Sequence, residues 1–178
     1  MQNKKLLKTI MAALFASLVC VATMVIRIPI PATQGYANLG DAIVLLAAFL
    51  LGPGYGALAA AVGSALADVL AGYALYAPGT AVIKGLCALA AAVLLRQLGK
   101  RIKWAYVPAG IAGEIVMAGG YFLYESTVLG YGMAAAGSIP ANAIQGAVGV
   151  LAGTALYLAL RRVPEIREYF SDKSETRR

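Results

Sequence analysis

Gly35-Tyr36-Ala37-Asn38-Leu39-Gly40-Asp41 is a polar interruption in a sequence dominated by apolar runs. Of the 178 residues, 61% are hydrophobic and 13% are charged, a composition that differs from that of soluble domains of this length. Asn38 and Asp41 have the spacing of a helix N-cap and an acidic N3 residue. The stretch is therefore predicted to begin a helix inside an integral membrane protein.

The apolar runs on both sides of this stretch have the character of membrane helices. Residues 6–26 provide roughly 20 residues, the length needed to cross a bilayer core of ~30 Å. Residues 42–51 are too few, so this run is predicted to be a short span, a partly sheltered one or one arm of a re-entrant hairpin. Gly52-Pro-Gly-Tyr-Gly56 is predicted to break the chain sharply after it. The remaining runs are residues 57–70, 80–95, 105–124 and 139–160.

The basic residues indicate how these runs are oriented. Lysine and arginine gather before the first run, between residues 96 and 103, and after the last run, whereas the opposite loops offer only Arg27. The net charge of +7 is therefore better explained by the positive-inside tendency than by nucleic-acid binding. We expect an all-α bundle of six transmembrane helices in residues 1–162, multi-pass in a bacterial-type plasma membrane, with both termini cytoplasmic and a polar tail in residues 163–178.

Several kinds of chemistry are excluded by composition. The sequence contains no histidine, which excludes a Ser-His-Asp triad and an HExxH zinc site. Cys20 and Cys87 lie in apolar runs without CxxC spacing and are interpreted as small buried hydrophobic residues. We expect no metal site, no cofactor and no enzymatic activity.

Polar residues inside the apolar runs are the candidates for function. A buried charge costs roughly 2.5–3.5 kcal/mol on insertion scales, so Lys84 and Glu114 need an explanation. Lys84, Asn142 and Gln145 are predicted to share one depth near the outer face, with Glu114 one to two turns deeper. Asp68, Tyr76 and Tyr121 are predicted at or above that depth, which together gives a polar pocket open to the outside.

Simpler explanations exist for the same residues. Lys84 and Glu114 are also the natural members of an ion pair that merely joins two helices. Asp68 is equally suited to capping loop amides, and tyrosines are common anchors at membrane interfaces. The sequence leaves these alternatives open.

A set of short motifs, taken in order, resembles one protein family, the S components of energy-coupling factor (ECF) transporters. The similarity covers residues 6–162 and is greatest to the branch that binds riboflavin, pyridoxine and hydroxymethylpyrimidine. The motifs are Asn38-Leu-Gly-Asp41, Gly52-Pro-Gly-Tyr-Gly56, Gly63-Ser-Ala-Leu-Ala-Asp68, Gly72-Tyr73, Tyr76-Ala-Pro-Gly-Thr80 and Lys84-Gly85.

The resemblance implies a substrate-binding subunit that captures a vitamin from outside. It implies a transmembrane scaffold protein and two ABC-type ATPases as partners, and the chain itself has no Gly-x-x-x-x-Gly-Lys-Ser/Thr motif. Similar proteins use the loop between the first two spans as a lid and a small-residue face of the first helix as the scaffold contact. The lid corresponds to residues 34–41, in which Gln34, Gly35, Tyr36 and Asn38 are candidates for binding the solute. The contact corresponds to Ala12 and Ala16.

The substrate class and the rival functions complete the hypothesis. A one-ring vitamin of the pyridoxine or hydroxymethylpyrimidine type suits Glu114 as partner of a ring nitrogen or amine, with riboflavin the next candidate. The first alternative is a self-contained secondary carrier or channel that uses Lys84 and Glu114, although no internal repeat supports it. The second is an intramembrane enzyme that uses Asp41 or Asp68 with Glu114.

Overall fold

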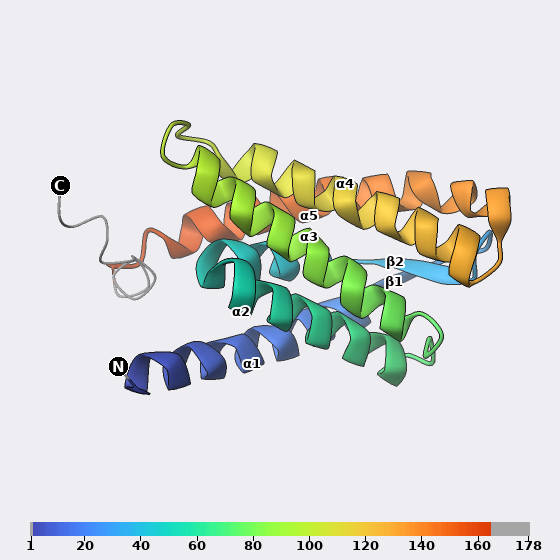
Figure 1. The fold of residues 1–178 in the computed structure, drawn as a ribbon, viewed down its shortest axis with the longest axis horizontal. Helices are drawn as coiled ribbons and strands as arrows, with labels where there is room; N and C mark the ends of the chain where they lie inside the picture. The colour runs from blue at the N-terminus through green and yellow to red at the C-terminus, as the bar shows by residue number, and fades with distance from the viewer. Residues whose placement is uncertain (1, 165–178) are drawn as a thin grey trace.

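The protein folds into one helical bundle, seen here in a computed structural model that describes residues 2–164. Within that range five helices are long and apolar enough to cross a membrane. They are α1 (Gln2–Val25), α2 (Gly40–Leu70), α3 (Ala77–Leu98), α4 (Tyr106–Leu123) and α5 (Ile139–Leu160) (Figure 1). A π-helical turn, η1 (Tyr124–Val128), continues α4, and a 3-10 helix, η2 (Gly132–Ser138), precedes α5. The predicted tail falls almost entirely in residues 165–178, outside the described residues.

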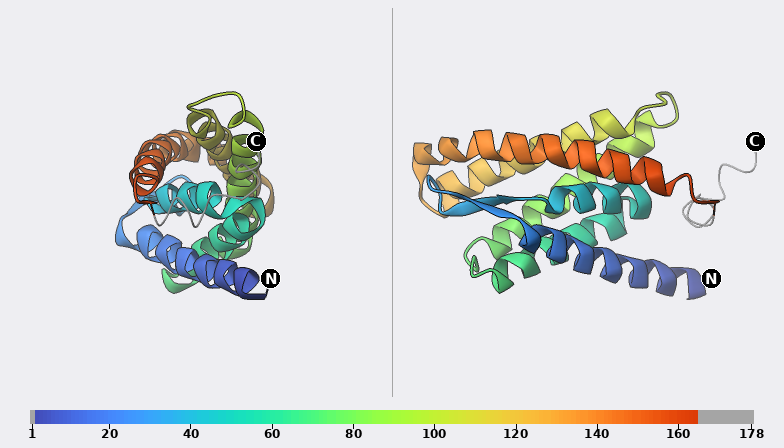
Figure 2. Two further views of the ribbon diagram at one scale, coloured as in Figure 1. Left: turned by 90° about the vertical axis from the view of Figure 1, so that its left-hand side faces the viewer. Right: turned by 180° about the vertical axis from the view of Figure 1, so that it is seen from behind.

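Helix α2 reverses its direction at Gly52. This glycine has φ 78° and ψ −174°, a backbone conformation that is essentially restricted to glycine. Pro53 then begins the second segment, as the sequence predicts for a proline at the first turn of a helix. A Cβ atom placed on Gly56 would lie 2.8 Å from the Cα of Ala48, whereas residues eight apart in a straight helix are about 12 Å apart. The two segments therefore fold back on one another, as both views show (Figures 1 and 2).

The first segment of α2 is short and sheltered. Residues 40–51 span about 18 Å at the helical rise, which is less than the ~30 Å of a bilayer core. Most of its side chains are buried by the other helices, including Val44, Leu45, Leu46, Ala47 and Ala48. This confirms the predicted break and the sheltered short run, but the six separate spans are not confirmed. The second and third predicted runs are the two segments of one reversed helix.

A β-hairpin connects α1 to α2, where a lid loop without strands is expected from the sequence. Strands β1 (Arg27–Ile30) and β2 (Gly35–Asn38) pair antiparallel, with Arg27 opposite Asn38 and Ile30 opposite Gly35. Pro29 is tolerated because β1 is an edge strand of a two-stranded sheet. We call residues 27–38 the lid hairpin; it lies near one end of the bundle, with its strands running along the helices (Figure 1).

The two ends of the bundle differ in charge. One end, here called the lid end, carries the lid hairpin, the 71–76 turn, η1 and η2 (Figure 1). At the opposite end lie the start of α1, the end of α5 and the basic loop that contains Lys100, Arg101 and Lys103 (Figure 2). Both described chain ends thus lie at the basic end. The positive-inside tendency predicts that this end faces the cytoplasm.

The reversal at Gly52 gives a first testable prediction. A side chain at this position is strained by its positive φ, and its Cβ would lie 2.6 Å from Nη2 of Arg96. We expect Gly52→Ala to lower the free energy of unfolding by about 1–3 kcal/mol, measured by unfolding in detergent. Gly54→Ala is the control, because a Cβ at Gly54 meets nothing within 4 Å. Equal unfolding midpoints for the two variants would contradict a special role for Gly52.

Candidate functional site

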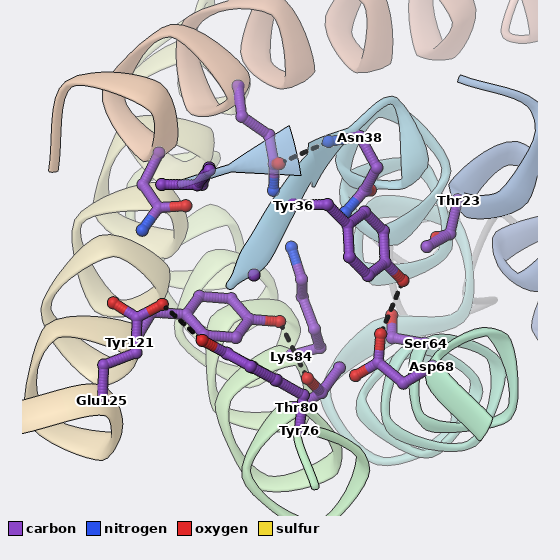
Figure 3. A pocket seen from close by; sticks show the side chains of 14 residues that line it. Thr23, Tyr36, Asn38, Ser64, Asp68, Tyr76, Thr80, Lys84, Tyr121 and Glu125 are labelled. Atoms are coloured by element: carbon purple, nitrogen blue, oxygen red, sulfur yellow. Dashed lines mark hydrogen bonds between the residues drawn. The ribbon is translucent and has the colours of Figure 1, made fainter. Parts of the chain in front are cut away.

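A small polar cavity lies beneath the lid hairpin, at the depth where residues from every long helix converge. Its volume is about 20 Å³, enough for a water molecule but too small for a heterocyclic ring. Figure 3 shows the side chains from α1, α2, α3, α4 and α5 pointing inward under β2. The lining residues are Thr23, Ile30, Gly35, Tyr36, Asn38, Ser64, Asp68, Tyr76, Thr80, Lys84, Tyr121, Glu125, Asn142 and Gln145.

Helical spacing explains why these residues share one cavity. Tyr76, Thr80 and Lys84 follow one another at four-residue steps at the start of α3, which places them on one face of that helix. Ser64 and Asp68 stand in the same relation near the end of α2. Tyr121 and Glu125 do so across the junction of α4 and η1. Helices α2, α3 and α4 with η1 therefore each contribute a row of polar groups to the cavity wall, whereas α1 contributes only Thr23.

The charge at the base of the cavity is balanced by an ion pair between Lys84 and Asp41. The Lys84 ammonium donates to Oδ1 of Asp41, and the two side chains are only 2% and 1% exposed. Asp41 is thus a buried counter-ion and not the N3 residue of a capping box. The N-cap of α2 is Leu39, and Asn38 Oδ1 instead accepts the Gly40 amide at 2.8 Å.

Gln145 of α5 joins this ion pair to the lid hairpin. Its Nε2 atom donates to Oδ2 of Asp41 at 2.5 Å, and its Oε1 atom accepts the backbone amide of Asn38 at 2.6 Å. One side chain therefore contacts both the fixed charge in the bundle and the end of strand β2. Gln145 therefore links the lid hairpin to the ion pair through two hydrogen bonds.

Two tyrosine hydroxyls fasten the lid hairpin over the cavity. Tyr36 of β2 donates to Oδ1 of Asp68 at 2.5 Å (Figure 3). Tyr76 donates to the carbonyl of Thr33 at 2.5 Å, from the turn that precedes α3. Burial, together with the hydrogen bond to Asp68, raises the pKa of the Tyr36 phenol, so Tyr36 remains a neutral donor at physiological pH.

Glu125 closes the lid end of the cavity wall. It is 2% exposed; its Oε2 atom accepts Ser138 Oγ at 2.5 Å, and its Oε1 atom lies 3.3 Å from the Tyr76 hydroxyl. The π-helical turn around it is a geometry frequently found at functional sites. Glu125 thereby links η1, η2 and the turn before α3.

Other buried polar atoms in the described residues have no hydrogen-bond partner. Ser64 Oγ and Asp68 Oδ2 are two of them, and both residues line the cavity. Both carboxylate oxygens of Glu114 are also unpartnered. Unpaired buried polar groups are costly, so the unpartnered atoms of Ser64 and Asp68 need an explanation.

Comparisons with known proteins give this geometry a family. Residues 3–162 match the family described as "ECF-type riboflavin transporter, S component". The chain belongs to this S-component family. It is 39% identical over 153 residues to an uncharacterized protein of Pyrococcus woesei, a match that covers 84% of this chain and 99% of that relative.

Solved structures agree with the family. The S component of a bacterial ECF transporter is 26% identical with a TM-score of 0.70, over 91% of this chain and 98% of that one. A biotin S component from an ECF-type ABC transporter is 18% identical with a TM-score of 0.66, over 96% and 99% of the two chains, and shows the fold alone. The chain is thus a vitamin-binding transporter subunit of a family that is not an enzyme family.

The S-component cavity brings together most of the residues proposed from sequence. Gly35, Tyr36, Asn38, Asp68, Tyr76, Lys84, Tyr121, Asn142 and Gln145 all line it. Gln34 lies at the tip of the lid hairpin, in a second cavity nearer the surface. The sequence prediction omitted Thr23, Ile30, Ser64, Thr80 and Glu125. Helix spacing was an available signal for Ser64, Thr80 and Glu125, because each stands four residues from a residue that was proposed.

Glu114 does not line this cavity, and the ion pair considered between Lys84 and Glu114 is wrong as a direct contact. Lys84 pairs with Asp41 instead. Glu114 packs against α5, where a Cβ on Gly146 would lie 2.9 Å from its own Cβ. Its role in solute binding therefore stays a prediction.

The structure places Ala12 and Ala16 against α2, so the scaffold contact assigned to them stays a prediction. Ala12 is 5% exposed and packs in a core cluster with Leu46 and Ala59. Ala16 lies against α2, where a Cβ on Gly63 would meet the Ala16 carbonyl oxygen at 2.3 Å. These alanines face the chain's own second helix, because the rotation of α1 turns them inward. The small residues on its exposed face are Thr9, Ala13 and Ser17.

The buried ion pair predicts a coupled stability effect. We expect Asp41→Asn to lower the free energy of unfolding by about 3–5 kcal/mol, because it leaves Lys84 buried without its counter-ion. The double variant Asp41→Asn/Lys84→Met should recover most of this loss. Chemical unfolding in detergent of the two single variants and the double variant measures the coupling, and additive effects would contradict it.

Proposed function

We propose that this S component binds a small, polar, single-ring heterocyclic vitamin or vitamin precursor, of the pyridoxine or hydroxymethylpyrimidine type. The observation that supports this is the composition of the cavity lining. Of the described residues that form it, Ile30 is the only one with an aliphatic side chain. Hydroxyl, amide, carboxylate and ammonium groups line the space together with the rings of Tyr36, Tyr76 and Tyr121. Such a wall suits a ring with several hydrogen-bonding substituents.

Riboflavin is the second candidate, because the family description names it. Its dimethylated benzene ring needs an extended apolar wall, as ligand pockets of larger aromatic molecules usually provide. The cavity offers only Ile30 and the faces of its tyrosine rings for that purpose. The single-ring vitamins therefore remain the preferred candidates for the substrate.

Binding requires the lid hairpin to move. The cavity volume of about 20 Å³ lies far below the ~300–1,000 Å³ of small-molecule sites. An entering solute has to separate Tyr36 from Asp68 and displace the Asn38 amide from Gln145. Its own donors and acceptors then replace these contacts, so the bonds that hold the lid hairpin closed are exchanged for bonds to the solute.

Transport is driven by partner proteins in this proposal. ECF S components work with a scaffold protein and ATPases. The outer face of α1 is suited to the scaffold contact, since Thr9, Ala13 and Ser17 repeat at four-residue steps and are exposed. Small residues at this spacing allow another helix to approach closely.

The first experiment tests the solute. The purified protein in detergent is titrated with pyridoxine, hydroxymethylpyrimidine, riboflavin and biotin by calorimetry. Asp68→Asn is expected to weaken binding of the preferred vitamin about 10- to 150-fold, the equivalent of losing a hydrogen bond to a charged group. Ser64→Ala is expected to weaken it about 2- to 10-fold, as for a neutral hydrogen bond.

Thr154→Ala is the matched control for Ser64→Ala. Thr154 also has a buried hydroxyl oxygen without a partner, but it does not line the cavity. Unchanged affinity in the Asp68→Asn and Ser64→Ala variants would place the solute elsewhere. A preference for riboflavin over the single-ring vitamins would reverse their order.

The second experiment tests the partner surface. Ala13→Leu should leave vitamin binding unchanged and reduce uptake roughly tenfold or more in cells that contain the scaffold and ATPases, because overpacking an interface costs ~1–3 kcal/mol. Ala147→Leu is the control, at an exposed small residue on α5. Normal uptake with Ala13→Leu would remove this face from the mechanism. Concentrative uptake by this chain without partners would favour the secondary carrier.

A further inference from the structure

A second cavity lies at the surface of the lid end, directly outside the first. Its volume is about 330 Å³, which falls within the usual range of small-molecule sites. Among the described residues, its lining contains no charged side chain and is rich in tyrosine. The lining residues are Gln34, Gly72, Tyr73, Ala74, Leu75, Tyr76, Leu129 and Tyr131.

Within the described part of the chain, Tyr76 is the one residue that lines both cavities. Its hydroxyl donates to the Thr33 carbonyl of the lid hairpin at 2.5 Å and lies 3.3 Å from Glu125 Oε1, as its position beside Glu125 in Figure 3 illustrates. The ring is 8% exposed and forms part of the wall between the two spaces. A solute that crosses from the outer to the inner cavity therefore passes Tyr76.

Two further tyrosines supply open aromatic surface to the outer cavity. The Tyr73 ring packs against Tyr36, with ring centroids 4.5 Å apart, and against Tyr76 at 6.5 Å. Tyr131 stands between Gly130 and Gly132, whose φ values of 75° and 54° give the turn that presents it. Its backbone amide is held by the Glu125 carbonyl at 3.0 Å. The same glutamate thus supports the outer tyrosine and the inner cavity wall.

We propose that the outer cavity is a docking site, in which a neutral, flat heterocycle stacks on Tyr73 and Tyr131 before it passes Tyr76. Aromatic stacking suits such a solute, and the uncharged lining gives no preference for an ion. The proposal rests on the proposed function, since it supplies the first step by which the same solute reaches the closed inner cavity.

A disulfide between the lid hairpin and η2 allows binding at the outer cavity to be measured separately from binding at the inner cavity. A Cβ on Gly137 would lie 2.7 Å from the Cβ of Ala32, so Ala32→Cys with Gly137→Cys needs a shift of about 1 Å to reach disulfide geometry. Cys20 and Cys87 are buried and do not compete for oxidation. The oxidised protein keeps the inner cavity shut while the outer cavity stays accessible.

Pyridoxine and riboflavin are the probes, titrated against the oxidised and the reduced protein. The reduced protein is expected to bind its preferred probe tightly and the oxidised protein weakly. Adding Tyr131→Ala should weaken the remaining binding about 2- to 12-fold, the value of one aromatic stacking contact. Tyr131→Phe should retain it, and Met133→Ala is the control at an 80% exposed neighbour.

The outcomes separate the docking site from the proposed function. If the reduced protein binds a probe and the oxidised protein binds none, the docking site is overturned and the proposed function stands. Weak binding that Tyr131→Ala leaves unchanged also overturns it. If the reduced protein binds neither these probes nor any other vitamin, the proposed function fails and the docking site fails with it.

Stopped-flow binding to the wild-type chain gives an independent measurement that needs no disulfide. A docking step makes the observed rate saturate as the probe concentration rises. Tyr131→Ala should raise the half-saturation concentration by the same 2- to 12-fold factor. A rate that stays linear with concentration, or a half-saturation point that does not move, contradicts the docking site.

Discussion

The buried ion pair between Asp41 and Lys84 is the interaction on which the arrangement of the lid end depends. Neither charge is tolerable alone at this depth, because an unpaired ion in the interior costs several kcal/mol. Lys84 is fixed by α3, so the chain has to bring Asp41 to it. It does so by descending as strand β2 and starting α2 only at Gly40, inside the bundle. The short first segment of α2 follows from that starting point.

The same constraint makes the lid hairpin part of the site. The second carboxylate oxygen of Asp41 accepts a hydrogen bond from the side-chain amide of Gln145. The amide oxygen of Gln145 in turn accepts a hydrogen bond from the Asn38 backbone amide. Strand β2 is therefore joined to the core charge through one side chain of α5. The close approach of α5 that this requires is permitted at Gly149, where a Cβ would lie 2.8 Å from the Cβ of Asp41.

Sequence reasoning recovered features that depend on composition and local backbone chemistry. The break at Gly52 and Pro53 and the grouping of Lys84 with Asn142 and Gln145 depend on spacing along the chain, and the structure has both. The partner of Lys84 was missed, because Asp41 also fits a helix-capping pattern and only tertiary packing distinguishes the two roles. The inward face of Ala12 and Ala16 was missed for a related reason, since spacing defines a helical face but not the direction in which it points.

The two cavities differ in the chemistry of their walls, which suits them to successive steps of the proposed binding path. The wall of the inner cavity contains charges and buried polar atoms without partners, and it therefore favours binding of a solute that forms specific hydrogen bonds. The wall of the outer cavity is uncharged and aromatic, so it selects for a planar ring that can stack and discriminates little between its substituents. In the proposed path, recognition begins with shape and ends with hydrogen bonds, so the lid hairpin stays closed until a ring of suitable outline is present. Tyr76 connects the two steps, because its ring borders both cavities and its hydroxyl donates a hydrogen bond to the lid hairpin.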